Sequence, residues 1–275
     1  RRNIYKMHTT DPAYFLGLPG LSWSLAMKHL PKGKAIELLE KPEHYIEFQN
    51  NIQGGITQVS QRYAKRKYEG SQSLSQIMYF DVNGLYAHIM ANCKLPYKLV
   101  EHSVDDGQNY TYEKIKELSE DEDHTYFFII DASISETMIE QNPALKFLPF
   151  FPVKINEKST KKSEFMKAQC EKHKLKDIDT FKLATVLDKT EKYMIHIKYL
   201  RLAMEAGYVL DKVHGYFKFA QDFVFKFYIE GNNKIKGDAT KSGNKFLRDL
   251  AKFLSNIIYG KTVQNILKQR DFEIV

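Results

Sequence analysis

The pattern of apolar and polar positions changes period several times along the chain, which predicts a mixture of strands and helices. Residues 75–80 form a short continuous apolar run of the kind that is buried on both faces of a sheet. Residues 84–93 switch to helical spacing, with apolar side chains on one side. A strand is predicted at 126–130. Residues 191–220 predict a strand, a helix that ends at Gly207 and another strand.

Proline and glycine positions mark the ends of further predicted helices. One helix is predicted from about Ser22, and a second starts near Pro42, a favourable residue type for a first turn. Residues 222–266 are mainly helical in pattern, with an interruption at 231–243. Strands and helices are mixed without an internal repeat, so the predicted class is α+β.

The last predicted helix carries a row of polar side chains on one face. A row of cations suits a string of phosphates such as a triphosphate. A solvated basic face is the alternative, and spacing alone leaves the two equally open. We expect the apolar residues Phe246, Leu250, Phe253 and Leu254 to be buried on other faces, and the helix to close at Gly260. The row consists of Lys241, Lys245, Arg248, Lys252, Asn256 and Tyr259, spaced 4, 3, 4, 4 and 3 positions apart.

A single carboxylate follows the apolar run at 75–80. Asp81 ends this predicted strand, and ligands gather at the carboxyl ends of strands in many folds. An exposed carboxylate there can hold a hard cation such as Mg²⁺, and the turn after it offers backbone N–H groups to an anion. The alternative is that Asp81 caps the following helix, which is the more frequent role for one such residue.

A third segment combines glycines, cations and aromatic rings. The Gly54-Gly55 pair permits close approach of another backbone. Arg62, Tyr63 and Lys65 follow within a basic stretch that also suits a nucleic-acid strand. A solvated basic loop is the alternative.

Composition narrows the class of partner. The net charge of +7 over 275 residues favours a polyanionic partner, and the 13% aromatic content supplies rings that can stack on bases. Cys93 and Cys170 match no zinc spacing, which favours a reducing environment. No apolar run approaches the roughly 20 residues of a membrane span, and no secretory leader opens the chain. We therefore expect an intracellular protein, in the nucleus or cytoplasm of a host, without a membrane partner.

In sequence order, these segments resemble the motifs of family B DNA polymerases, specifically the protein-primed branch of viruses, linear plasmids and Maverick/Polinton-type elements. "DVNGLY" resembles motif A, D-x-x-S-L-Y, and "KFLSNIIYG" resembles motif B, K-x-x-x-N-S-x-Y-G. "IQGG" resembles the Y-x-G-G/A motif that precedes motif A. The resemblance implies a palm with an antiparallel sheet and helices, helical fingers and a small α+β insertion.

The resemblance also implies a role for each matching residue. Asp81 would be a catalytic metal ligand together with the Val82 carbonyl, and the metal would be Mg²⁺ or Mn²⁺. The turn through Leu85 would hold triphosphate oxygens, and Tyr86 would exclude a 2′-OH. The motif B residues Lys252, Asn256, Tyr259 and Gly260 would bind the nucleotide and line the new base pair, with Lys252 and Tyr259 counted as catalytic. Arg248, one turn before this motif in the cation row, is also counted as nucleotide-binding. Gly54, Gly55, Arg62, Tyr63 and Lys65 would contact DNA.

The implied reaction is two-metal nucleotidyl transfer from a dNTP to a DNA 3′-OH or to the hydroxyl of a priming protein. The implied partners are a DNA template-primer, a dNTP and a terminal priming protein. The implied division is a palm start at 1–99, an insertion at 100–180 that resembles the primer-protein-interacting region, a palm continuation at 181–230 and fingers at 231–275.

The sequence departs from the family pattern at four motif positions and in extent. Gly84, Ala87, Ile257 and Ile52 replace the usual Ser, Pro, Ser and Tyr. The second metal-binding aspartate of the family, in a D-T-D motif, and the exonuclease domain are expected outside this chain. The chain alone is therefore expected to be a weak catalyst. The alternative is a catalytically inactive relic or domesticated fragment that binds nucleic acid or a partner protein.

Overall fold

The computed structural model of the protein describes residues 4–5, 8–59, 63–105, 107–156, 158, 161–176, 179–187 and 189–268. The helices are α2 (Leu18–Lys28), α3 (Pro42–Asn51), α4 (Leu85–Asn92), α5 (Tyr112–Ser119), α6 (Glu136–Gln141), α7 (Glu164–Lys172), α8 (Ile197–Glu205), α9 (Lys226–Lys241) and α10 (Lys245–Thr262), with 3₁₀ turns η1 (Pro12–Tyr14), η2 (Pro143–Lys146) and η3 (Ile266–Lys268). The strands are β1 (Tyr68–Glu69), β2 (Gln72–Ser73), β3 (Leu95–Val104), β4 (His124–Ser133), β5 (Pro152–Asn156), β6 (Phe181–Thr185), β7 (Thr190–His196) and β8 (Val209–Asp222).

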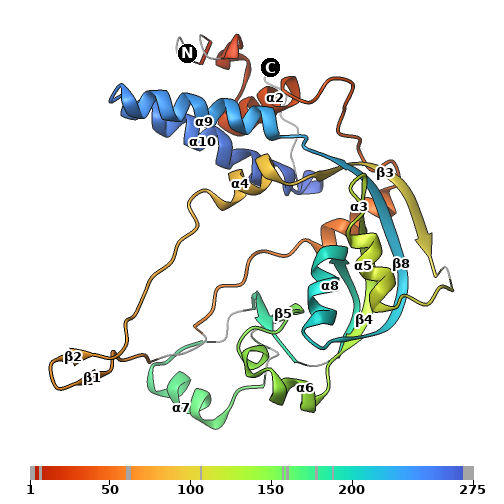
Figure 1. Ribbon diagram of the computed structural model, residues 1–275, viewed down its shortest axis with the longest axis vertical. Helices are drawn as coiled ribbons and strands as arrows, with labels where there is room; N and C mark the ends of the chain where they lie inside the picture. The colour runs from red at the N-terminus through yellow and green to blue at the C-terminus, as the bar shows by residue number, and fades with distance from the viewer. Residues whose placement is uncertain are drawn as a thin grey trace.

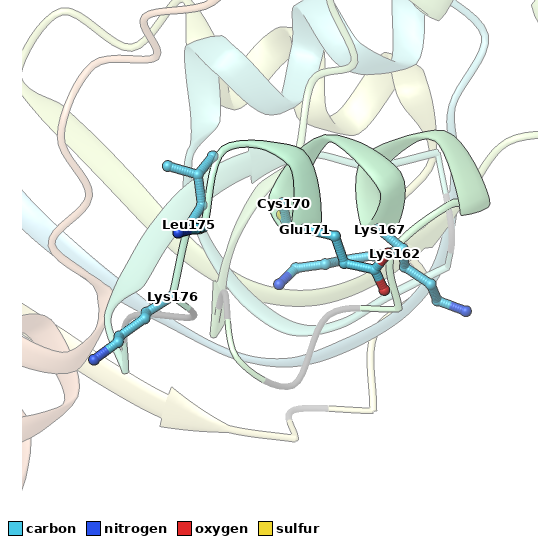
Figure 2. Close-up of a pocket in the computed structure, with 7 residues that line it drawn as sticks. Lys162, Lys167, Cys170, Glu171, Leu175 and Lys176 are labelled. Atoms are coloured by element: carbon cyan, nitrogen blue, oxygen red, sulfur yellow. The ribbon is translucent and has the colours of Figure 1, made fainter.

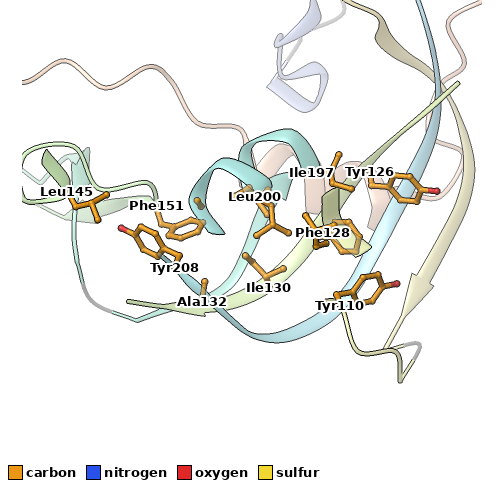
Figure 3. Close-up of a cluster of buried hydrophobic side chains, with 13 residues drawn as sticks. Tyr110, Tyr126, Phe128, Ile130, Ala132, Leu145, Phe151, Ile197, Leu200 and Tyr208 are labelled. Carbon is orange, nitrogen blue, oxygen red and sulfur yellow. The ribbon is translucent and has the colours of Figure 1, made fainter. Parts of the chain in front are cut away.

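A four-stranded antiparallel sheet with strand order β3-β8-β4-β7 organises one half of the chain. Strand β4 alternates between its two faces, because successive side chains of a strand point to opposite sides. Tyr126, Phe128, Ile130 and Ala132 are buried on one face, where they pack with residues of α5 and α8 (Figure 3). This core fixes α5 and α8 on the same side of the sheet.

Helix α3 packs through aromatic rings against residues of the other face. Phe48 meets Phe127 of β4 at 5.4 Å and Phe217 of β8 at 5.0 Å between ring centroids, in edge-to-face geometry. His44, one turn earlier on α3, contacts Phe217 at 5.2 Å and His102 at 4.4 Å. The sheet is therefore covered by helices on both faces, and α3 leads directly into the segment with Gly54.

Helices α2, α4, α9 and α10 form a second packed group around their own core, and β8 runs from the sheet to this group (Figure 1). Inside it, the Ser22 hydroxyl donates to the Leu254 carbonyl at 2.8 Å and lies 2.9 Å from the Tyr228 hydroxyl. These buried bonds join α2, α9 and α10. Buried polar groups with satisfied bonds fix one arrangement of the helices, so α10 is held in a defined position.

His196 joins the sheet to α8 as a neutral ring. Its Nδ1 accepts from the Lys198 N–H at 3.2 Å, so the proton of the neutral ring is on Nε2, 2.8 Å from Thr125 Oγ1. Burial, with the Lys198 charge as a smaller cause, lowers the pKa of His196 to about 4. In the unfolded chain His196 binds a second ring proton near pH 6.5, whereas in the folded chain it stays neutral at that pH.

Acidification should therefore destabilise the fold through His196. Its contribution is complete above about pH 6.5 and is lost as the pH falls toward 4, by about 2–3 kcal/mol in unfolding free energy. His196→Asn keeps a side chain that caps helices well but cannot titrate. Urea unfolding at pH 7 and near pH 4.5 should show a smaller acid-induced loss in this variant than in the wild type. Equal losses in both proteins would contradict the assignment.

The predicted α+β class is confirmed, since helices combine with antiparallel sheets. The helix at Pro42, the helix after Gly84, the strand within β4, and the strand, helix and strand of 191–220 are also confirmed. The helix placed at Ser22 starts earlier, at Leu18. The helical pattern is interrupted, but only at 242–244 and not over the predicted 231–243, because α9 runs through Gly231 and Gly237 and ends at Lys241.

The buried strand predicted at 75–80 was also wrong. These residues form no strand, and 76–80 are exposed, with Tyr79 91% and Phe80 79% exposed. A strand needs a hydrogen-bonded neighbour, and the described strands pair elsewhere. The apolar run is therefore an extended connection between the β1-β2 hairpin and α4 (Figure 1). In the described part of the chain, no helix has the length and apolarity needed to cross a membrane.

Candidate functional site

The turn between Asp81 and α4 is built on a left-handed glycine. Gly84 precedes α4 with φ +65° and ψ +37°, and no side chain caps this helix end. The cap role open to Asp81 is therefore ruled out. Asp81 is exposed and makes no hydrogen bond or ion pair with the described residues. Its carboxylate is free to bind something outside the chain.

Gly84→Ala should destabilise the fold by about 1 kcal/mol, because only glycine tolerates a positive φ without strain. No atom lies within 4 Å of the added Cβ, so the cost comes from the backbone alone. Gly237→Ala is the matched control, since Gly237 is an open helical glycine in α9, where alanine should stabilise by about 0.5–1 kcal/mol. Urea unfolding should show opposite signs, and a neutral Gly84→Ala would contradict the strained turn. Serine, the residue of the family motif, would meet the same backbone cost.

Tyr86 and Tyr259 stack on each other although they lie far apart in the sequence. Their ring centroids are 4.1 Å apart and the ring planes are within 19°. Tyr86 is on the first turn of α4 and half exposed, and Tyr259 is near the end of α10. Burial and the neighbouring Tyr86 raise the pKa of Tyr259. The stacked pair joins the segments that resemble motifs A and B.

Asn256 and Lys252 lie one and two turns, respectively, before Tyr259 on α10. Both are exposed and line an open hollow of about 540 Å³ with Asp249, Phe253 and Ile257. Lys252 makes no hydrogen bond or ion pair with the described residues, so its ammonium can bind an external anion. The predicted grouping of Lys252, Asn256 and Tyr259 along one stretch of α10 is present in the structure.

The longer cation row is not continuous. Lys241 belongs to α9 and Lys245 to α10, with a turn between them, so the helical spacing does not extend across both. Arg248 is occupied by Asp249, whose carboxylate accepts from Nε and Nη2 at 2.9 Å. This pair is surface-exposed and contributes little to stability, so it can open toward another anion.

Three further expectations for α10 were wrong in part. The helix continues through Gly260 to Thr262 instead of closing at the glycine. Leu254 is buried and Leu250 packs against the helical core, as expected, but Phe246 and Phe253 are 64% and 60% exposed. Phe253 was therefore missed as a lining residue of the hollow. Its position directly after Lys252 was the available indication.

The residues predicted to contact DNA lie apart from this hollow. Gly54 and Gly55 are exposed in an extended segment after α3, and Tyr63 and Lys65 are exposed before the β1-β2 hairpin. Arg62 lies outside the described residues. In Figure 1, the hairpin projects at the opposite end of the molecule from α9 and α10. One nearby cation, Arg66, covers the Tyr68 ring at 5.2 Å.

A second hollow, of about 700 Å³, lies beside α7 (Figure 2). Lys162, Lys167, Lys174 and Lys176 line it together with Cys170. It contains no residue that the sequence motifs indicate. We therefore treat the α10 hollow as the candidate site.

The residues around Asp81 do not amount to a metal centre. Within the described ranges, no group of three or more His, Cys, Asp or Glu side chains could hold a metal ion. Asp81 offers one carboxylate and the adjacent Val82 one carbonyl, both at exposed positions. A two-metal site needs more than one carboxylate to hold two ions about 4 Å apart. The donor set fits a partial metal site only.

Comparisons with known proteins identify the family of the chain. The family model described as DNA polymerase type B, organellar and viral, matches residues 18–273. No curated protein matches the chain. Among solved structures, phi29 DNA polymerase in an orthorhombic crystal form is similar to this chain, with a TM-score of 0.39 and 21% sequence identity. The match covers 67% of this chain and 26% of the phi29 polymerase chain. The chain thus spans about a quarter of that polymerase. Because the family model matches nearly its whole length, the chain belongs to the organellar and viral type B DNA polymerase family.

Proposed function

We propose that the chain is the nucleotide-binding part of a DNA-directed DNA polymerase and holds a dNTP between α4 and α10. The stacking of Tyr86 on Tyr259 at 4.1 Å carries this proposal, because it joins the motif A and motif B segments at one place. The exposed Lys252 on the same helix adds a cation without an internal partner. Family membership supports DNA and dNTPs as the substrates.

Each side chain has a distinct part in this proposal. Lys252 binds the triphosphate, and the backbone N–H groups of the turn through Leu85 face its oxygens. The Tyr86 ring lies under the sugar and leaves no room for a 2′-OH. Asn256 and Tyr259 border the base pair, and Gly260 leaves space beside it. Arg248 adds a second cation once it leaves Asp249.

The template strand would follow the segment from Gly54 to the β1-β2 hairpin. Gly54 and Gly55 carry no side chain that hinders a close backbone, and Lys65 supplies a charge for a phosphate. Tyr63, which is 72% exposed, offers a ring on which a base can stack. Arg62 would add to the same surface.

The proposed role of a divalent metal, Mg²⁺ or Mn²⁺, is limited to binding at Asp81 and the adjacent backbone. Asp81 and the Val82 carbonyl would each supply one ligand. Because the described residues contain no group of three or more His, Cys, Asp or Glu side chains that could hold a metal ion, we derive no reaction step through a metal.

The division into palm start, insertion, palm continuation and fingers at 1–99, 100–180, 181–230 and 231–275 is also a proposal. A terminal priming protein as partner is proposed from the motif resemblance alone, and an intracellular site of action from the two cysteines and the lack of a long apolar run in the sequence.

A primer-extension assay with labelled template-primer, the four dNTPs and Mg²⁺ tests the proposal, together with binding of the same DNA and of a dNTP. The proposal expects saturable binding of both, with incorporation as the readout of activity. The second candidate, an inactive relic, is favoured because the described residues form no group of three or more side chains that could hold a metal ion. It expects binding without incorporation, whereas a chain that binds neither DNA nor dNTP would contradict the proposed function.

A further inference from the structure

The segment with Gly54 and Gly55 forms no helix or strand, yet side chains on both sides of the glycines make hydrogen bonds to a distant part of the chain. Residues 52–59 connect α3 to the stretch before β1 in an extended, largely exposed conformation. The side chains of Gln53 and Gln58, just before and after the glycine pair, both form hydrogen bonds. Their partners all come from residues 147–193, which are far away in sequence.

Tyr193 of β7 makes the first of these bonds. Its hydroxyl donates to Gln53 Oε1 at 2.7 Å. The ring is partly buried and packs edge-to-face on Phe151 at 5.3 Å, so the hydroxyl is held by the sheet core. Burial raises the pKa of Tyr193 to about 12, so the phenol keeps its proton at neutral pH and remains a donor.

Gln58 makes the second attachment, on the other side of the glycines. Its Oε1 accepts from Thr185 Oγ1 of β6 at 3.1 Å, and its Nε2 donates to the Phe147 carbonyl. At the end of α3, Lys154 Nζ of β5 donates to the Asn50 carbonyl at 3.3 Å. Strands β5, β6 and β7 therefore each hold one point along this segment.

A glycine pair gives the backbone its greatest freedom, and an unrestrained pair samples many conformations. Bonds on both sides limit this freedom without placing a side chain over the glycines themselves. No atom lies within 4 Å of the position that a Cβ would take on Gly54 or Gly55. The two glycines are thus open to a ligand, while the hydrogen bonds on both sides of them fix the direction of the backbone.

We propose that Tyr193 is a positioning residue that holds the Gly54-Gly55 segment in its open orientation through Gln53. Thr185, Phe147 and Lys154 hold the rest of the segment. The role in template binding rests on the proposed function, whereas the tether itself does not.

Tyr193→Phe tests the tether, because it removes only the hydroxyl. Tyr199→Phe is the matched control: its hydroxyl donates to the Phe150 carbonyl at 3.0 Å, and it makes no hydrogen bond to residues 50–58. Thermolysin cleaves before large apolar residues in mobile extended chain, so Ile56 and Val59 report on the segment. Residues 77–80 are exposed, extended and without bonds to the described residues, so they serve as an internal reference.

Mass spectrometry should show cleavage at Ile56 and Val59 rising about fivefold in Tyr193→Phe relative to 77–80, the change expected on losing one net hydrogen bond. Gln53→Leu should give the same rise, and the double variant no more than either single one. Tyr199→Phe should leave the ratio unchanged. An unchanged ratio in Tyr193→Phe, or additive effects in the double variant, would overturn the tether.

Binding of a labelled template-primer, measured by fluorescence anisotropy, tests the consequence. Tyr193→Phe and Gln53→Leu should raise the Kd for DNA about fivefold, with little change in the Kd for a dNTP. Normal DNA affinity despite faster cleavage would overturn the link to template binding. A wild-type chain that binds no DNA would contradict the proposed function, while the cleavage ratios would still decide whether Tyr193 positions the segment.

Discussion

Lys252→Ala is expected to weaken binding of a dNTP by about 10- to 100-fold, the loss that follows from removing one charge-assisted hydrogen bond. Lys252 is exposed and unpaired within the described residues, so no internal partner compensates for its loss or is left unsatisfied by it. The chain should consequently fold normally. Titration of the dNTP by calorimetry, with urea unfolding as a check on the fold, measures the change.

Two comparisons make this result specific to the triphosphate. Lys245→Ala is the matched control, because Lys245 is exposed on the same helix two turns before Lys252 and outside the hollow. It should change the Kd less than twofold, as expected for a distant surface charge. A deoxynucleoside without phosphates should bind the wild type and Lys252→Ala alike. Equal losses for Lys252→Ala and Lys245→Ala would mean that only the overall charge matters.

Tyr86→Val should relax the discrimination between deoxyribonucleotides and ribonucleotides by about tenfold or more. The Tyr86 ring is half exposed and is held by its stacking on Tyr259. Removing the ring opens space for a 2′-OH, and a pocket that excludes a group by shape loses that exclusion when it is widened.

The ratio of the Kd values for an rNTP and its dNTP measures this effect. Tyr86→Phe keeps the ring and its stacking, so it should retain the wild-type ratio. If the protein extends a primer, the same ratio can be read from incorporation. Continued rejection of rNTPs by Tyr86→Val would show that Tyr86 does not set the choice of sugar.

Local patterns in the sequence were sufficient for most helices and for strands β4, β7 and β8 of the main sheet, whereas β3 was not predicted. Pro42 starts α3, and the alternation of β4 marks its two faces. The apolar run at 75–80 failed as a strand prediction because pairing is not a local property. Periodicity cannot tell whether a neighbouring strand is available. Helix α9 crosses two glycines because Tyr228 and Ile229 bury its first turns in the helical core.

The candidate site, too, could be predicted only where it depends on local sequence patterns. The spacing of Lys252, Asn256 and Tyr259 along one helix was readable from sequence, since it depends on helix geometry alone. The contact between Tyr86 and Tyr259 depends on how α4 and α10 pack, and only the motif resemblance placed the two together. No pattern indicated that Tyr193 bonds to Gln53, because each residue is unremarkable in its own segment.

The most direct test of the central claim is photoaffinity labelling with an azido-dNTP in the presence of Mg²⁺ and template-primer, with the labelled peptides identified by mass spectrometry. A site between α4 and α10 predicts label on the peptides that contain Tyr86 and Lys252–Tyr259, reduced by excess unmodified dNTP. Competed label confined to the lysine-lined hollow beside α7, with none on α4 or α10, would contradict it.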